Sequence, residues 1–169
     1  TVTVSWTTQY YLTVNSAYGN PQGEGWYNAG TTAHWSVTSP WPGPEGTRWV
    51  TDPYAEDVLM DAPKTVTVPW TTQYYLTIDS LYGNPQGAGW YNAGSTANWS
   101  VTSPWYLDSY TRYVTSPTSG SVLMNEPMTL HCHWDGEFFL TIDSDYGEPV
   151  GGDWYEEGTL AIWSVTSPW

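Results

Sequence analysis

One stretch of sequence occurs three times in this chain, and its recurrence limits what the chain can fold into. Residues 1–14 (TVTVSWTTQYYLTV) return as residues 65–78 (TVTVPWTTQYYLTI) and, with many substitutions, as residues 129–142 (TLHCHWDGEFFLTI). The copies begin 64 residues apart, and no insertion or deletion is needed to align them. A fixed period longer than about 50 residues indicates an array of small domains rather than a thin solenoid.

The rest of the repeat keeps the same spacing. The motif SVTSPW occurs at residues 36–41, 100–105 and 164–169. Residues 1–41 and 65–105 differ at only seven positions, where the second copy carries Pro69, Ile78, Asp79, Leu81, Ala88, Ser95 and Asn98. The chain has 169 residues, so the third copy stops early. We therefore expect two full repeats and one incomplete repeat.

Apolar and polar side chains alternate along the recurring stretch, which is the pattern of a half-buried β-strand. In the first copy the apolar side carries Val2, Val4, Trp6, Tyr10, Leu12 and Val14. At about 3.3 Å per residue, fourteen residues would span roughly 46 Å, far more than a usual strand. We therefore predict two strands in series, of which the first closes one repeat and the second opens the next.

Turn signals divide the remainder of each repeat into short extended pieces. Residues 15–25 (NSAYGNPQGEG) and 40–46 (PWPGPEG) are rich in Gly, Pro and Asn, which favour turns over helices and central strands. No segment has the 3.6-residue apolar period of a helix. We predict an all-β chain of tandem β-sandwich or open-barrel-like repeats. The predicted segments are an N-terminal strand at 1–7, repeats at 8–70 and 71–134, and an incomplete repeat at 135–169.

Each repeat is small, and a domain of about 60 residues buries only about 60% of its unfolded surface. The chain compensates with thirteen Trp and fourteen Tyr residues, whose rings each bury roughly 150–250 Å². Disulfides add nothing, because Cys132 is the only cysteine. A disulfide-rich secreted scaffold is therefore excluded.

The charge balance limits the partners. The net charge is −14, and the only cationic side chains are Arg48, Lys64 and Arg112, which argues against nucleic acid and anionic membrane surfaces. No apolar run approaches the 18 residues that a membrane span needs, so we expect no membrane insertion. The chain starts at Thr1 without a signal-like segment, so we expect a processed chain or a fragment. Its Thr-, Ser-, Asn- and Tyr-rich, weakly charged surface is typical of an extracellular protein.

The turn region resembles a known family. Residues 21–37 (PQGEGWYNAGTTAHWSV) are similar to the internalin B-repeat-like β domains of bacterial and archaeal surface proteins, in which a Y-x-L-T-V strand precedes G-x-G-x-Y-x-x-G and an extended T-x-A segment. The matching residues are Tyr11, Leu12, Thr13, Val14, Gly23, Gly25, Tyr27, Gly30, Thr32 and Ala33. The resemblance implies tandem stalks, adhesins and cell-surface architecture, without an active site. The chain departs from the family in its Trp density and its shortened third repeat.

Two groups of residues raise the question of a metal. Period two places His131 and His133 on one face of their strand and Cys132 on the other, in the apolar position of Val4 and Val68. We therefore interpret Cys132 as a core residue, while a two-His metal site would lack further ligands. Asp143, Asp145 and Glu148 lie in a turn that could hold Ca²⁺. The first repeat has Asn15, Ala17 and Asn20 at these places and is expected to fold alike, so we favour an ordinary acidic surface. We assign no metal site and no cofactor.

Catalytic signatures are not found. No acid pair recurs in the three repeats, and no G-x-S-x-G motif or Cys–base pair is present, so we do not expect an enzyme and name no catalytic residues. Tyr11 and Tyr75 face outward by parity and could stack on sugars, which keeps glycans open as partners. Asn98-Trp99-Ser100 is an N-glycosylation sequon with its Asn on the outward face.

The ends of the array suggest how copies could associate. Residues 1–6 form a closing strand without a preceding repeat, while the third repeat lacks its closing strand. An unpaired strand and an open edge favour strand addition between copies. We predict a structural subunit of an extracellular filament or pilus, a homopolymer joined head-to-tail by Val2, Val4 and Trp6. The alternatives are a fragment of a longer cell-surface stalk, adhesin or S-layer protein, and a carbohydrate-binding module of a secreted enzyme.

Overall fold

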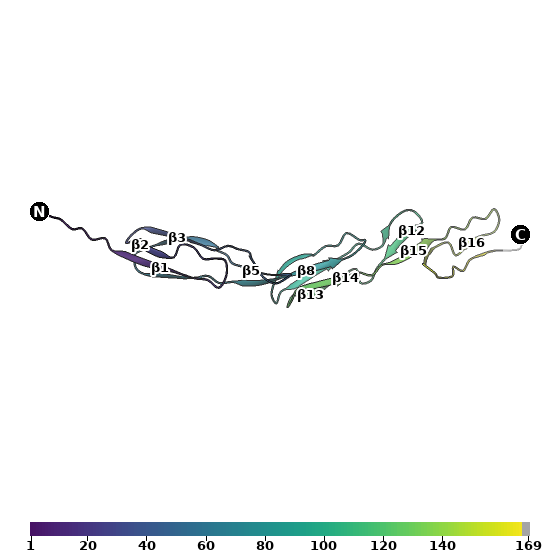
Figure 1. Ribbon diagram of the computed structural model, residues 1–169. Coiled ribbons are helices and arrows are strands. Elements are labelled where there is room, and N and C mark those ends of the chain that lie inside the picture. The colour runs from purple at the N-terminus through teal and green to yellow at the C-terminus, as the bar shows by residue number, and fades with distance from the viewer. Residues whose placement is uncertain (167–169) are drawn as a thin grey trace. The chain divides into compact units, whose positions relative to one another are not determined.

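The computed structural model describes residues 1–166 and is built of β-strands (Figure 1). The all-β prediction is confirmed, and within residues 1–166 no helix is formed, hence none that could cross a membrane. The last three residues of the predicted segment 135–169 lie outside the described part. The strands fall in small sheets of two to five members.

The first full repeat contributes seven strands, and their bounds follow the alternation and turn signals of the sequence. They are β1 (Gln9–Asn15), β2 (Gly25–Asn28), β3 (Thr32–Ser36), β4 (Trp41–Pro42), β5 (Thr47–Val50), β6 (Ala55–Leu59) and β7 (Lys64–Thr67). The second repeat contributes β8 (Thr71–Asp79), β9 (Gly89–Asn92), β10 (Thr96–Ser100), β11 (Trp105–Tyr106), β12 (Thr111–Val114), β13 (Ser119–Leu123) and β14 (Met128–His131). The third contributes β15 (Asp135–Phe139), β16 (Pro149–Val150), β17 (Trp154–Glu156) and β18 (Ser164–Val165).

The strands group into two compact units. Unit 1 comprises Thr1–Tyr75, Trp90–Ser95 and Met124–Pro127, and unit 2 comprises Leu76–Gly89, Thr96–Leu123 and the residues from Met128 onward. Strand β8 therefore has its first residues in unit 1 and its last residues in unit 2.

In unit 1, β1 is the central strand of a three-stranded sheet. It pairs antiparallel with β2 and parallel with β7, with Leu12 opposite Lys64 and Val14 opposite Val66. Strands β3 and β6 pair antiparallel beside it. The core consists of side chains from β1 and β3 and from the residues that directly follow β3, β6 and β7, namely Leu12, Val14, Ala33, Trp35, Val37, Met60 and Val68.

Unit 1 also holds a second pairing, between β5 and the first half of β8. Strand β5 pairs antiparallel with β4 on one side and with residues 71–74 of β8 on the other, so that Arg48 lies opposite Gln73. Strand β9 pairs with β8 as well.

Unit 2 repeats these pairings 64 residues later. The second half of β8 pairs parallel with β14, with Leu76 opposite Met128, and β10 pairs antiparallel with β13. Strand β12 pairs antiparallel with β11 and β15, and β15 pairs with β17. Toward the end of the described residues, β16 and β18 form a short antiparallel pair.

In its first copy the recurring stretch has no strand at residues 1–8, so the strand predicted at 1–7 is not formed there. The stretch forms two strands in series, as predicted, in its second and third copies: β7 precedes β8, and β14 precedes β15. Its second strand differs in length between the copies. Strand β8 has nine residues, β1 has seven and β15 has five. The lengths differ because the pairing partners differ. We call β5 and its counterpart β12 the β5-type strands, and β7 and β14 the closing strands. Strand β8 pairs with β5 at its start and with the closing strand β14 at its end. Of these two kinds of partner, β1 has the closing strand β7 alone and β15 has the β5-type strand β12 alone.

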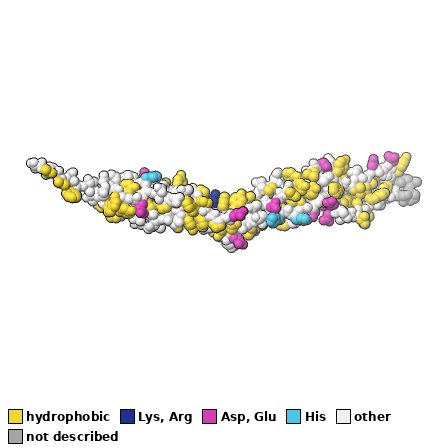
Figure 2. All heavy atoms as spheres, viewed as in Figure 1, with side chains coloured by type: hydrophobic (Ala, Val, Ile, Leu, Met, Phe, Trp, Pro, Cys, Tyr) yellow, Lys and Arg dark blue, Asp and Glu magenta, His cyan; other side chains and the backbone are white. Residues whose placement is uncertain are grey.

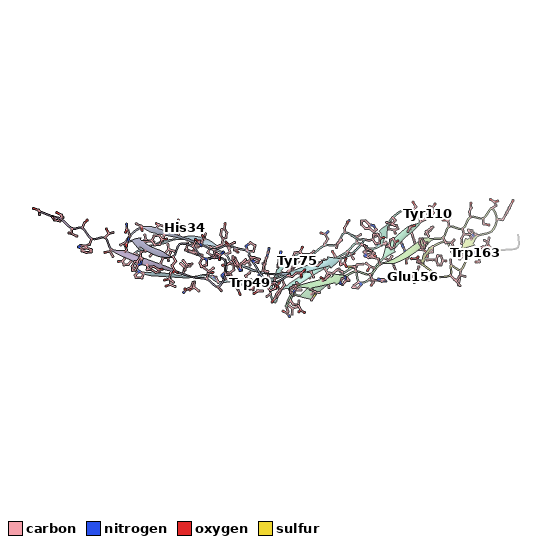
Figure 3. All side chains as sticks on the ribbon, viewed as in Figure 1. His34, Trp49, Tyr75, Tyr110, Glu156 and Trp163 are labelled. Atoms are coloured by element: carbon pink, nitrogen blue, oxygen red, sulfur yellow. The ribbon has the colours of Figure 1, made fainter. Side chains whose placement is uncertain are left out.

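The 64-residue period predicts that Trp35, Trp99 and Trp163, together with Val37, Val101 and Val165, are buried in equivalent positions. This prediction holds for the first repeat and is wrong for the third. Trp35 and Val37 are buried, as is Val101, whereas Trp99 is half-buried. Trp163, expected in the equivalent core position, is 62% exposed (Figure 3). The physical reason is that the described third repeat contains no counterparts of β6 and β7, whose side chains cover Trp35 in the first repeat.

Candidate functional site

The candidate site is the strand edge against which the closing strand of a repeat pairs; we call this edge and the turn that follows it the seat. In unit 1 the seat is β1 with its following turn, and β7 occupies it. Strand β7 lies parallel to β1, and the Val68 N–H continues the ladder by donating to the Asn15 carbonyl over 2.9 Å. Val68 is buried in the core, and Val66 packs against it. The alternating apolar residues of the closing strand are therefore the ones that enter the core.

A tryptophan fixes the end of this strand. The Trp70 indole Nε1 donates to the Ser16 hydroxyl Oγ over 2.9 Å, and Ser16 Oγ donates to the Tyr18 carbonyl over 2.7 Å. The Trp70 ring stands edge-on to Tyr18, with 5.8 Å between ring centroids and an interplanar angle of 89°. Gly19 has φ +82° and lies beneath the indole, where a Cβ would come within 2.8 Å of the ring. Only glycine fits both the backbone angle and the space.

Unit 2 contains the same seat with the next copy of the residues. Trp134 Nε1 donates to Ser80 Oγ over 2.9 Å, and Trp134 meets Tyr82 edge-on at 5.8 Å and 90°. The Cys132 N–H donates to the Asp79 carbonyl over 2.9 Å, as Val68 does to Asn15. Cys132 is half-buried, so the expected core position is reached only in part.

In the third repeat the corresponding residues are present, and within residues 1–166 no closing strand lies against them. Residues 140–143 belong to no strand in the described part of the chain, although the Leu140 N–H donates to the Asp153 carbonyl on the side facing β17. Leu140 is half-buried, whereas its counterparts Leu12 and Leu76 are fully buried. Residues 140–143 also line a cavity of about 280 Å³, together with Trp163 and Val165. We call residues 140–143 the acceptor edge.

The hydroxyl that would receive an indole is already in place there. Ser144 Oγ donates to the Tyr146 carbonyl over 2.5 Å, the same contact that orients Ser16 and Ser80. Tyr146, the counterpart of Tyr18, is 78% exposed. The acceptor edge therefore has the polar end-point that the filled seats use, and within residues 1–166 no closing strand pairs with it.

The residues predicted to fill such an edge are all exposed. Val2 and Trp6 are each 92% exposed and Val4 is 66% exposed. Residues 1–8 form no strand and leave β1 as an extended segment (Figure 1), on which Figure 2 shows hydrophobic side chains. The structure brings Val2, Val4 and Trp6 together on this segment and packs none of them into a described core.

Sequence reasoning missed the serine and tyrosine that receive the tryptophan. The signal was available, because all three copies contain S-x-Y-G, at residues 16–19, 80–83 and 144–147. The motif alone indicates only a turn, because the tryptophans that donate to Ser16 and Ser80 lie 54 residues later in the chain.

Asn98, the predicted glycosylation site, lies on β10 opposite Ser121, and its side chain is exposed. The acceptor nitrogen is thus accessible in this structure. Glycosylation itself stays a prediction.

The two histidines considered for metal binding contact different carboxylates. His131 Nδ1 lies 2.9 Å from Asp79 Oδ2, while His133 Nε2 lies 3.2 Å from Asp135 Oδ1. Within residues 1–166 no group of three or more His, Cys, Asp or Glu side chains is arranged to hold a metal ion. The acidic turn residues Asp143, Asp145 and Glu148 belong to no such group either.

Two tyrosines have shifted acidity. The Tyr11 hydroxyl donates to Glu24 Oε1 over 3.0 Å, and this hydrogen bond to a carboxylate raises the pKa of Tyr11 above 10.0. A hydrogen bond with Tyr82 raises the pKa of Tyr113, and the two rings stack at 4.3 Å. Both shifts therefore arise from contacts between neighbouring side chains.

No protein-family model matches the chain, and no curated protein or solved structure shows significant similarity to it. The resemblance to internalin B-repeat-like domains therefore stays a prediction from the residues quoted for it.

Proposed function

We propose that the chain is a structural subunit that assembles head-to-tail into a filament by donating residues 1–6 to the acceptor edge of the next copy. One observation carries the proposal. The third repeat contains an open seat for a closing strand, and residues 1–6 are an unpaired copy of the strand that fills that seat in the other two repeats.

The filled seats supply the register of the junction. Because Val14 lies opposite Val66 in a parallel pair, Val2 of one copy would lie opposite Ile142 of the next. By the same offset the Val4 N–H would donate to the Asp143 carbonyl. The donor strand would then place Val2 and Val4 in the cavity beside Trp163.

The tryptophan would complete the junction. Trp6 is the counterpart of Trp70 and Trp134, so its indole would donate to Ser144 Oγ and stand edge-on to Tyr146. Burying a ring of roughly 150–250 Å² contributes about 4–6 kcal/mol, and each buried Val contributes about 2 kcal/mol. Association itself costs about 4–15 kcal/mol, so Trp6 is the residue that decides whether the junction is stable.

The geometry of this contact produces a fibre. The donor and the acceptor are different surfaces of the same chain, so the contact is heterologous, and such a contact extends into a filament when its rotation does not close a ring. Pairing along an open strand edge also satisfies backbone groups that are otherwise left to water.

The proposed location is outside the cell or at its surface. The chain carries only three Lys and Arg residues against seventeen Asp and Glu residues, a surface that stays soluble through like charge and that does not attract nucleic acid. The exposed sequon at Asn98 fits the same setting. The intact mass of native material, compared with the bare chain, tests whether Asn98 carries glycan.

Assembly is tested by deleting residues 1–6 and by Trp6→Ala, with electron microscopy of the purified protein as the measurement. Both variants should abolish filaments, because they remove the donor or its largest apolar group. They should leave the melting temperature of the monomer unchanged, because residues 1–6 pack against no described core. Leu81→Ala is the matched control, as Leu81 is 85% exposed elsewhere in the chain. Filaments that persist without residues 1–6 would rule out strand donation.

A further inference from the structure

Each full contact between a β5-type strand and its partner contains an arginine stacked on a tryptophan. In unit 1 the Arg48 guanidinium carbon lies 4.4 Å from the ring centroid of Trp90, and Arg48 Nε donates to Gln73 Oε1 over 2.8 Å. Tyr75 meets Trp90 edge-on at 5.2 Å. The guanidinium is therefore held by one aromatic face and one side-chain oxygen.

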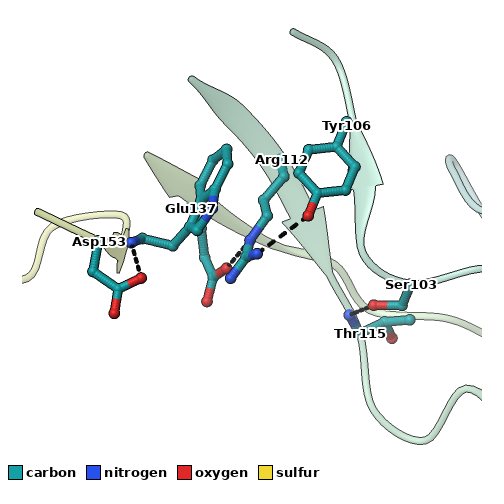
Figure 4. A network of polar contacts seen from close by, with 7 residues as sticks. Ser103, Tyr106, Arg112, Thr115, Glu137 and Asp153 are labelled. Carbon is teal, nitrogen blue, oxygen red and sulfur yellow. Dashed lines mark hydrogen bonds and ion pairs between the residues drawn. The ribbon is translucent and has the colours of Figure 1, made fainter. Parts of the chain in front are cut away.

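Unit 2 contains the same arrangement with an acidic acceptor. The Arg112 guanidinium lies 4.4 Å from the Trp154 centroid, and Arg112 Nε donates to Glu137 Oε2 over 2.5 Å (Figure 4). Phe139 meets Trp154 edge-on at 5.3 Å, as Tyr75 meets Trp90. The side chains of Arg112 and Glu137 are only 21% and 20% exposed. We call this set of three side chains the arginine cradle: a tryptophan under the guanidinium, an aromatic ring edge-on to that tryptophan, and a side-chain oxygen that accepts from the arginine Nε.

The first repeat has the cradle without the arginine. Trp26 and Tyr11 form the same edge-on pair at 5.3 Å, and Gln9 Nε2 donates to Asn28 Oδ1 over 3.0 Å. The equivalent bond from Gln73 Nε2 to Asn92 Oδ1, at 2.8 Å, leaves Oε1 for Arg48. Gln9 thus has the orientation of an occupied site, yet Trp26 is 66% exposed whereas Trp90 and Trp154 are half-buried.

The backbone beside this cradle is open as well. In unit 1, residues 71–74 of β8 pair antiparallel with β5, which brings Arg48 opposite Gln73. The corresponding residues 7–10 pair with no β5-type strand within residues 1–166, and Thr7 and Thr8 are not strand residues for that reason. A strand that paired here in the same register would place its second residue opposite Gln9 and above Trp26.

A second copy of the chain has no arginine to offer. Its two arginines, Arg48 and Arg112, already occupy the cradles at Trp90 and Trp154, and Lys64 pairs with Asp61 at 2.7 Å. Glu24 lies beside Tyr11, and the chain carries a net charge of −14. A cationic partner is therefore favoured by charge.

We propose that Gln9, Tyr11 and Trp26 form a binding site for an arginine-bearing β-strand from outside these 169 residues, which adds antiparallel to residues 7–10. The occupied cradles give the motif of the partner, T-R followed by an aromatic residue and Val, as in β5 and β12. Arginine is required over lysine because its planar guanidinium stacks on the indole and donates sideways to an oxygen at once.

This site does not depend on the proposed filament. Strand donation would fill the acceptor edge at residues 140–143 but would supply no counterpart of β5, so the cradle would remain open at every junction. The site therefore exists equally in a free subunit and in an assembled one. A test that works in either state can separate the two proposals.

The test measures the binding of a fluorescently labelled cyclic peptide with the sequence of residues 41–51 (WPGPEGTRWVT) to the full chain by fluorescence anisotropy. The matched peptide carries citrulline, which is neutral and nearly isosteric, in place of Arg. We expect saturable binding of the arginine peptide. Loss of the cation–π contact should weaken binding about fivefold or more for the citrulline peptide, and Trp26→Ala in the protein should do the same. Tyr54→Ala, at another exposed aromatic of unit 1, should leave binding unchanged.

Three results would overturn the proposal. They are no rise in anisotropy at millimolar protein, equal affinity for the arginine and citrulline peptides, and binding that is insensitive to Trp26→Ala. A sugar platform at Trp26 would be recognised by saccharide binding that Trp26→Ala abolishes while the arginine peptide does not bind. The citrulline comparison needs no protein variant, so a misfolded mutant cannot obscure the outcome.

Discussion

The indole Nε1 of Trp70 donates a 2.9 Å hydrogen bond to the hydroxyl of Ser16, a residue 54 positions earlier in the chain. The bond joins the end of a closing strand to the turn that follows β1, and Trp134 and Ser80 repeat it in unit 2. Ser144 offers the same hydroxyl in the third repeat with no indole from the described residues against it. This one relationship links the stability of a repeat to the proposed association of copies.

The first prediction concerns that bond. Trp70→Phe keeps an aromatic ring and removes the donor, so it should lower the free energy of unfolding by about 1–2 kcal/mol, the net value of a hydrogen bond plus the smaller ring. Ser16→Ala should cost about 1 kcal/mol, and the double variant should cost less than the sum, because the two residues share one contact. Urea unfolding measures all three. If the losses of unfolding free energy in the two single variants add up to the loss in the double variant, the bond contributes nothing. Trp26→Phe, at an exposed tryptophan, is the control.

The second prediction compares equivalent tryptophans. Trp35→Ala should destabilise the protein by about 3–5 kcal/mol because a buried indole is removed. Trp163→Ala should cost less than about 1 kcal/mol in the monomer, since Trp163 is exposed. In assembled protein, Trp163 should become protected from oxidation, which peptide mass spectrometry can follow. Equal losses for both variants in the monomer would contradict the burial described here.

The third prediction concerns Tyr11. Glu24→Gln removes the carboxylate that holds the Tyr11 proton, so the pKa of Tyr11 should fall toward 10.0. A raised pKa in the folded state means that the hydrogen bond supports the fold below about pH 10 and is lost as pH rises through the raised value. An NMR titration of the Tyr11 ring resonances measures the shift. An unchanged Tyr11 pKa in the variant would show that another group causes the shift.

The fourth prediction concerns Cys132, which lines a cavity of about 190 Å³ together with Trp99 and Leu130. Val68 fills the equivalent position in unit 1 and is buried. Cys132→Val should therefore raise the free energy of unfolding by about 0.5–1 kcal/mol through better filling of this space. Cys132→Ser places a polar group there and should lower it. A loss of stability with Val would mean that the site is already closely packed.

Much of this arrangement could be predicted from alternation and spacing. Period two identified Leu12 and Val14 as core residues, and the span of the recurring stretch required two strands. Parity says nothing about strand direction, so the parallel pairing of β1 with β7 could not be predicted: alternation is the same in parallel and antiparallel sheets.

The features that the sequence does not predict also depend on how distant strands pair. The Trp163 position is apolar by sequence, but its burial depends on strands that the described third repeat does not contain. Arg48 and Trp90 lie in different repeats, and nothing in the local pattern of either indicates a contact. Contacts between distant residues follow from the register of paired strands, and that register was not available from composition or motif.

The central claim is strand donation in a defined register, and a cysteine-pair experiment tests it most directly. In a Cys132→Val background, Val2→Cys is combined with Ile142→Cys, or with Thr141→Cys as the control on the opposite face of the strand. In paired parallel strands the Cα atoms of partner residues lie about 5 Å apart, a separation within the range that a disulfide bond spans.

Mild oxidation followed by non-reducing gel electrophoresis reads the result. A covalent ladder of oligomers from the Val2–Ile142 pair, and none from the Val2–Thr141 pair, is the predicted outcome. Two results would contradict the donation of residues 1–6 to the acceptor edge. Either the Val2–Ile142 pair gives only monomers, or both cysteine pairs give equal ladders.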